Sequence, residues 1–203
     1  IVDPLTIFSL LLIILYSAEI VWREHSLNFN LIIDAVPTKN STFFLSKFFV
    51  VVLLPIILIT TGILMCINFQ VSLSYTNFEF SLYASLYYNY GLQLMIFSMI
   101  AIFVNSIAKS KYVGMGIFSL IVILSLKSSL IGLEHPLTSI GFMPRVAYSN
   151  MNGFYGGSSL FNHLALYWLV FGLFLMTLSF KMWNRGVVSG LLFKLKKLRY
   201  ELT

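Results

Sequence analysis

The feature that most constrains this chain is a set of long apolar stretches without charged residues. One of them begins FFVVVLLPIILITTGILMCI at Phe48 and meets no charged residue before Glu79. A helix of about 20 apolar residues crosses the roughly 30 Å hydrocarbon core of a bilayer. The chain is 59% hydrophobic and only 10% charged, whereas soluble domains are about 25% charged. It is therefore predicted to be a polytopic membrane protein.

Five helices are predicted to cross the membrane, and no segment requires a strand. Asp3 and Pro4 precede the first of them, and proline suits the first turn of a helix. Ser41 is predicted to cap the second, in which Pro55 and Gly62 predict a kink that neighbouring helices tolerate. The fold class is thus an all-α bundle, with spans near 5–22, 42–67, 88–108, 112–131 and 160–183.

Lysine and arginine are distributed unevenly over the connections, and the richer side usually faces the cytoplasm. With residues 23–41 in the cytoplasm, only Lys127 and Arg145 lie on the outer side. The other basic residues lie inside: Arg23, Lys39, Lys47, Lys109, Lys111, Lys181, Arg185, Lys194, Lys196, Lys197 and Arg199. We expect the N-terminal end of the segment outside and its C-terminal end inside. A protein that starts in the cytoplasm then has at least one helix upstream.

Two basic features outside the connections have more than one interpretation. Lys127 lies fifteen residues after Tyr112, about 22 Å along the fourth span, where it either extends to the outer surface or lies in a transport path. Residues 1–186 form the predicted transmembrane domain, and residues 187–203 form a basic amphipathic tail. The tail either rests on an anionic inner leaflet or leads into a further domain. It accounts for much of the net charge of +6 without nucleic acid.

The connection between the first two spans contains a short amphipathic pattern. From Ser26 to Val36 apolar residues recur at helical spacing, and Pro37 ends the pattern. Such a helix is too short to span, so it either rests among the headgroups or offers a face to a soluble partner. Just before it, Glu19 and Arg23 have the spacing of an ion pair on one helix face.

The pattern E-x-x-W-R-E, then D-A-x-P, then a lysine ten residues later resembles the permease subunits of type-two ABC transporters. The residues that match are Glu19, Trp22, Arg23, Glu24, Asp34, Ala35, Pro37 and Lys47. In that family this segment is a cytoplasmic coupling helix that docks in a groove of the ATPase subunit. The resemblance implies that residues 23–40 couple to an ATPase, with Glu24, Leu27, Leu31 and Asp34 as the main contacts.

Further motifs resemble one branch of these permeases, in which large bacterial proteins often also carry a zinc aminopeptidase-like domain. The motifs are Y-T-N-F-E (75–79), G-L-E-H-P-L (132–137), Y-S-N-M-N-G-F (148–154), L-Y-W (166–168) and W-N-R-G (183–186). Relatives usually have W-R-E-R where this chain has His25 after Glu24. The resemblance implies a bacterial inner-membrane protein paired with a second permease half or with another copy of itself.

Residues 132–160 are too polar and too rich in glycine and proline to span, yet they contain many aromatic residues and methionines. The resemblance implies short re-entrant helices before the last span, closing the outer end of the path. Four residues are candidates for an outer gate or a partner contact: Tyr148, Asn150, Asn152 and Gly153. The alternative is an ordered loop that caps the bundle.

The sequence contains no recognisable catalytic or metal-binding set. His25, His135 and His163 fall in different loops or on different sides of the membrane, whereas a metal site needs three or four convergent ligands. Cys66 lies in an apolar run and is predicted to be a small hydrophobic residue of the interior. There is no phosphate-binding G-x-x-x-x-G-K-[ST] loop, so ATP and magnesium are expected on the partner ATPase. We expect a non-enzymatic transport component; the alternative is a secondary transporter or a membrane assembly subunit without an ATPase.

Overall fold

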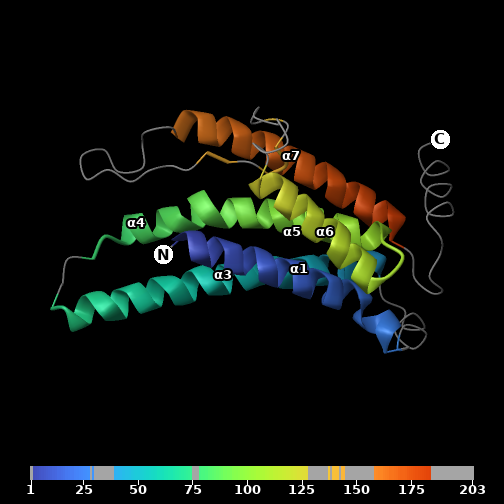
Figure 1. Cartoon of the computed structure of the whole chain (residues 1–203), viewed down its shortest axis with the longest axis horizontal. Helices are drawn as coiled ribbons and strands as arrows, with labels where there is room; N and C mark the ends of the chain where they lie inside the picture. Colours follow the sequence, from blue (N-terminus) through green and yellow to red (C-terminus); the bar gives the residue numbers. More distant parts are fainter. Residues whose placement is uncertain are drawn as a thin grey trace.

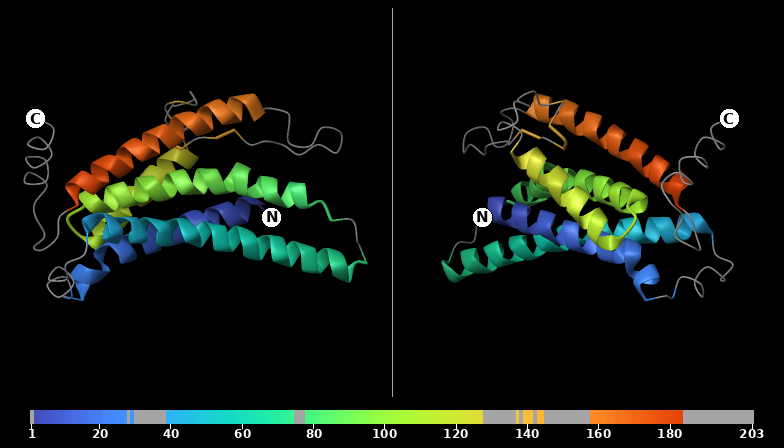
Figure 2. Two further views of the ribbon diagram at one scale, coloured as in Figure 1. Left: turned by 180° about the vertical axis from the view of Figure 1, so that it is seen from behind. Right: turned by 45° about the vertical axis from the view of Figure 1, so that its right-hand side comes forward.

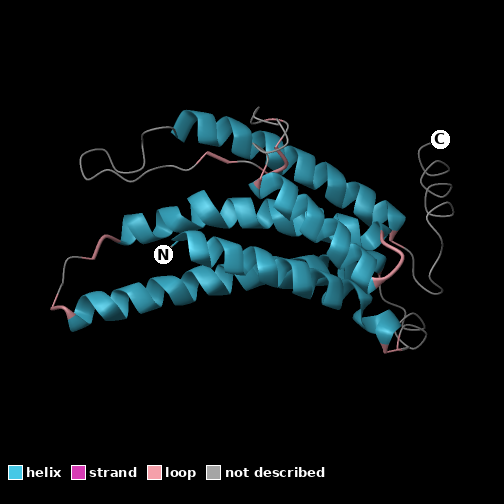
Figure 3. Ribbon diagram, viewed as in Figure 1, coloured by secondary structure: helices cyan, strands magenta, loops and turns pink. Residues whose placement is uncertain are grey.

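The protein is all-helical in the part of the chain that its computed structural model describes, namely residues 2–27, 29, 39–74, 78–127, 137, 139–141, 143–144 and 158–183 (Figure 3). The helices are α1 (Val2–Ser26), α3 (Asn40–Ser72), α4 (Phe80–Leu86), the π-helix η1 (Tyr87–Gly91), α5 (Leu92–Ile107), α6 (Lys111–Leu126) and α7 (Ser158–Met182). Because α4, η1 and α5 follow one another without a break, they form one long helix.

Four helices of the described chain are long and apolar enough to cross a membrane: Pro4–Ser26, Asn40–Ser72, Phe80–Ile107 and Ser159–Met182. Their outward faces carry large apolar side chains such as Phe49, Met65 and Leu166, each more than 60% exposed. Exposed apolar surface of this extent is unfavourable in water and favourable in lipid. The chain is therefore a multi-pass membrane protein.

The fourth predicted span is shorter than expected. Helix α6 ends at Leu126, and Lys127 adopts a non-helical conformation at its C-terminal end. Its 16 residues extend about 24 Å, which is less than the thickness of a bilayer core. The predicted continuation to Ile131 lies outside the described residues. Helix α6 is tilted against its neighbours (Figure 1). Lys127, whose side chain is exposed, lies at its C-terminal end.

Helix α5 is the centre of the bundle. Every residue from Ile96 to Ile102 is buried, and the helix packs against α1, α3, α6 and α7 (Figures 1 and 2). A helix that is apolar and buried on all sides is typical of a bundle interior. Small side chains permit the close approach of its neighbours: Gly172 of α7 lies over Met99, and Ser106 Oγ lies 2.8 Å from Ser179 Oγ of α7.

The helix boundaries correct three details of the predicted spans. Helix α1 continues one turn beyond Trp22, to Ser26. Helix α3 begins at Asn40 with Lys39 at the N-cap and no side-chain cap, so Ser41 does not cap it. The predicted start of the third span near Tyr88 was too late, because α4 begins at Phe80 and continues through η1. Helix α3 remains a single helix around the buried Pro55.

Candidate functional site

One end of the bundle gathers all the lysines and arginines of the described chain except Lys127, which lies at the far end of α6. The end of α1, the start of α3, the α5–α6 turn and the end of α7 lie together there (Figures 1 and 2). We call this the basic end; its cations are Arg23, Lys39, Lys47, Lys109, Lys111 and Lys181. The sequence predicted that these residues share one side of the membrane. The helix arrangement places them at the same end of the bundle.

Lys47 connects three helices at the basic end. Its Nζ lies 3.0 Å from Glu24 Oε1 of α1 and donates a hydrogen bond of 3.4 Å to the carbonyl oxygen of Val21. The same ammonium lies 4.8 Å from the ring centroid of Trp183, at the end of α7, which is within the range of a cation–π interaction. Because the residue is only 7% exposed, its charge depends on these partners.

Glu19 pairs across the bundle rather than along its own helix. Its carboxylate forms an ion pair with Lys111, at the start of α6, so the predicted pair with Arg23 is replaced by a contact between α1 and α6. The side chain of Arg23 is exposed. Both acidic residues at the end of α1 are thus held by lysines of other helices, which fixes this end of α1 against α3 and α6.

The described residues just beyond α1 present apolar side chains to the exterior. Leu27 is 65% exposed and Phe29 is 50% exposed, and their backbone N–H groups donate to the carbonyl oxygens of Arg23 and Glu24. Trp22 and His25 lie side by side, with ring centroids 5.7 Å apart. The other predicted coupling residues, Leu31, Asp34 and Pro37, lie outside the described residues.

A buried polar contact that the sequence analysis missed joins α1, α5 and α6. The side-chain amide of Asn105 donates to Ser17 Oγ at 3.1 Å and to the carbonyl oxygen of Ala101 at 2.9 Å. Its Oδ1 faces Gly114, where an added Cβ would lie only 2.2 Å away. An asparagine inside an apolar span is costly and usually has a partner. The presence of Asn105 in the third predicted span could therefore have indicated a contact with a neighbouring helix.

A second group of residues enters the bundle from the connection before α7. Gln93 Nε2 donates to the carbonyl oxygen of Gly141 at 3.3 Å, and Ser125 Oγ donates to that of Ile140 at 2.5 Å. Gln93 lies fourteen residues from Ile107, about 21 Å along the helix, which is near the middle of the 28-residue span. Non-helical backbone therefore lies deep in the bundle at residues 139–141. The predicted gate residues Tyr148, Asn150, Asn152 and Gly153 lie outside the described residues.

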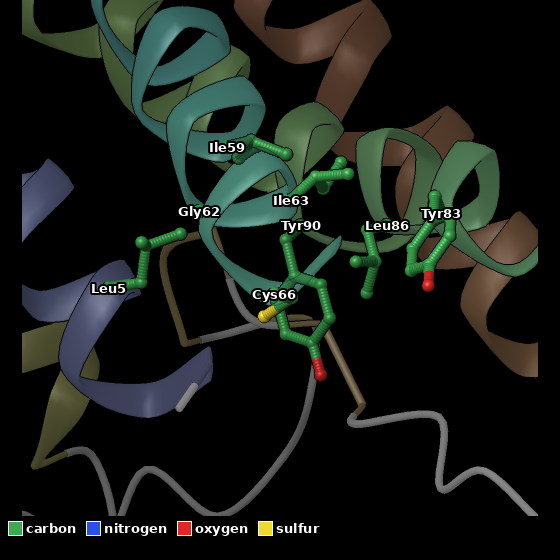
Figure 4. A pocket seen from close by; sticks show the side chains of 8 residues that line it. All are labelled: Leu5, Ile59, Gly62, Ile63, Cys66, Tyr83, Leu86 and Tyr90. Carbon is green, nitrogen blue, oxygen red and sulfur yellow. The ribbon is translucent and has the colours of Figure 1, made fainter. Parts of the chain in front are cut away.

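A small apolar cleft lies at the opposite end, between α1, α3, α4 and η1 (Figure 4). Its volume is about 120 Å³, and its lining includes Cys66, whose thiol is free. Hydrogen bonds connect its walls, since Thr60 Oγ1 lies 2.8 Å from Tyr87 Oη and Tyr83 donates to Gln70 Oε1. The sequence predicted that Cys66 would be buried in the interior. The structure places it half-buried at this cleft instead.

Within the described residues, no three His, Cys, Asp or Glu side chains converge in a way that could hold a metal ion. The chain was compared with protein-family models, with curated proteins and with solved structures, and none of the three comparisons gave a match. The functional argument therefore depends on the residues and their contacts.

Proposed function

We propose that this chain is the membrane-spanning permease segment of an ABC transporter. It would move a substrate across the cytoplasmic membrane with energy from a separate ATPase docked on residues 23–40. ATP and magnesium bind to that ATPase in this proposal, and the chain itself catalyses no reaction. The motif from Glu19 to Lys47 resembles the coupling region of type-two permeases, and the arrangement of helices at the basic end supports a coupling role.

The observation that carries the proposal is the contact set of Lys47. The ATPase-docking segment would follow α1 and precede α3, and Lys47 holds both helices together through Glu24 and Val21. Its contact with Trp183 adds α7. A displacement of the segment would thus be transmitted to three helices at once, as a rigid-body switch requires.

The residues of the coupling region have different roles in this proposal. The exposed Leu27 and Arg23, with Leu31 and Asp34, would contact the ATPase. Glu24 is already paired with Lys47, so it positions the segment instead of offering a free carboxylate. This refines the sequence-based expectation that Glu24 is itself a main contact.

The outer side of the transport path would be closed by the connection before α7. The carbonyl oxygen of Gly141 accepts a hydrogen bond from Gln93, near the middle of the long helix formed by α4, η1 and α5. The carbonyl oxygen of Ile140 accepts one from Ser125 of α6. Backbone that is not helical is tolerated at membrane depth when it packs against protein. This supports a re-entrant segment over a simple surface loop.

The proposal is tested by affinity capture of the tagged full-length protein in mild detergent, followed by identification and assay of a co-purifying ATPase. Wild type is expected to capture it, and Asp34→Lys is expected to lose it. Glu79→Lys provides the matched control, because Glu79 is exposed at the opposite end of the bundle.

A charge exchange separates the positioning role of Glu24 from direct contact. Glu24→Lys places two ammonium groups together and is expected to lose the ATPase. Adding Lys47→Glu restores the ion pair in reverse and is expected to recover capture. If no ATPase is captured by wild type, the proposal fails. The secondary transporter or assembly subunit then becomes the better account, and Lys127 is the next residue to change.

A further inference from the structure

A groove of about 710 Å³ opens between α3 and α7 at the basic end, and neither α1 nor α6 contributes to its lining. Met99 of the central helix α5 forms its floor, and Phe44, Phe48 and Met176 line its walls. Helices α3 and α7 converge toward this end with α5 between them (Figure 2, left). We propose that the groove binds an anionic phospholipid, with its acyl chains between the two helices and its phosphate beside Lys181.

The groove has an apolar part and a polar end, arranged in the same order as the acyl chains and the headgroup of a phospholipid. Its lining is apolar along its length apart from Thr177, whose hydroxyl donates to the carbonyl oxygen of Phe174 in its own helix. Ser41 and Lys181 lie at the end nearest the α3 N-terminus. Along α7 the lining extends from Leu173 to Lys181, about 12 Å at 1.5 Å per residue. The groove therefore receives the headgroup and the nearest part of the acyl chains, in the order in which a phospholipid presents them.

The charges at the basic end favour the binding of an anionic group. Within the described chain the two acidic residues of the basic end, Glu19 and Glu24, are already paired with Lys111 and Lys47. Lys181 makes no ion pair with any described residue, and no acidic residue lies in the first turn of α3. Basic pockets between transmembrane helices are the kind of site that binds anionic headgroups.

The shape of the groove favours a flexible chain over a helix. The ring of Phe44 contacts those of Phe180 and Trp183, each with centroids 5.7 Å apart, so α3 and α7 meet beside the headgroup position. A helix is about 10–12 Å wide with its side chains and cannot continue past this closure. An acyl chain can bend into the space. Because it leaves the apolar bilayer for an apolar groove, its transfer contributes little to the difference in affinity between lipids. Discrimination between lipids therefore comes mainly from Lys181 and the headgroup charge.

The test is native mass spectrometry of the delipidated protein titrated with phosphatidylglycerol or with phosphatidylcholine of the same acyl chains. One basic residue near a headgroup contributes about 1 kcal/mol, or about fivefold in affinity. We expect one site that prefers phosphatidylglycerol by about this factor. Lys181→Gln should abolish the preference. Lys109→Gln should keep it, because Lys109 is exposed in the α5–α6 turn and lies outside the groove.

A second pair of variants tests the acyl position without a change of charge. Thr177→Trp fills the groove one turn before Lys181 and should weaken the binding of both lipids. Leu166→Trp places the same ring on the lipid-facing surface of α7 outside the groove and should leave binding unchanged. Equal affinity for the two lipids in wild type, or an equal effect of the two lysine variants, overturns the proposal. So does a lipid-free dimer that Thr177→Trp dissociates, since a second copy would then occupy the groove.

Discussion

The ammonium of Lys47 and the carboxylate of Glu24 lie 3.0 Å apart and join the start of α3 to the last turn of α1. The side chain of Lys47 is 9% exposed, and that of Glu24 is 26% exposed. The two partners therefore differ in how easily water can replace the ion pair. This difference in exposure determines which single substitution is expected to destabilise the protein more.

Glu24→Gln is expected to destabilise the protein more than Lys47→Met. The first change removes the carboxylate that lies 3.0 Å from a buried ammonium, which costs about 1–3 kcal/mol, although Val21 and Trp183 remain as partners. The second leaves a carboxylate that can reach solvent. Thermal unfolding in one detergent measures both, with Arg23→Gln as the control at an exposed neighbouring charge. Equal melting temperatures for Glu24→Gln and Arg23→Gln would show that the pair is not structural.

Gly114→Ala is expected to disturb the contact between α1, α5 and α6. The new methyl group would lie 2.2 Å from Asn105 Oδ1, so the amide must turn away from Ser17 or the helices must separate. Overpacking of this kind costs about 1–3 kcal/mol. Gly116→Ala on the same helix meets nothing within 4 Å and is expected to be neutral or slightly stabilising, since glycine is a poor helix former. Similar melting temperatures for the two variants would contradict this account.

The helices and the gathering of charge at one end could be predicted from the sequence, because both follow from properties of single segments. Length, hydropathy and the positions of lysine and arginine are local quantities. The end of α6 at Leu126 was missed because Leu130 and Ile131 follow Lys127, Ser128 and Ser129 in the sequence and extend the apolar stretch in a hydropathy reading. Hydropathy alone does not locate the last residue of a helix.

The lateral partners could not be predicted in the same way. Glu19 has Arg23 one turn away on its own helix, yet it pairs with Lys111. That choice depends on α6 packing beside α1, which no spacing along the chain reveals. The same is true of Asn105 and Ser17, which belong to different helices and meet only in the folded bundle. Trp183 was assigned to the end of a span, and its contact with Lys47 appears only in three dimensions.

Gly141→Ala is expected to destabilise the deep segment before α7. Gly141 has φ +67°, and an added Cβ would lie 2.9 Å from Phe97 Cζ. The left-handed backbone costs an ordinary residue about 1 kcal/mol, and the contact with a fully buried ring adds to it. Gly91→Ala is the comparison, because its nearest new contact is an ordinary 3.6 Å. A melting temperature for Gly141→Ala as high as that of Gly91→Ala would show that residues 139–141 are not held against α5.

Cysteine labelling in spheroplasts is expected to show that the basic end faces the cytoplasm. In a Cys66→Ser background, Glu79→Cys and Lys109→Cys each place one exposed thiol at opposite ends of the bundle. A membrane-impermeant maleimide should label the first in intact spheroplasts and the second only after permeabilisation, because lysine and arginine are retained on the cytoplasmic side during insertion. Equal labelling of both in detergent confirms that each thiol is reactive. The reverse pattern would place residues 23–40 outside the cell, where no ATPase driven by cytoplasmic ATP could reach them, and would overturn the proposed coupling role as well.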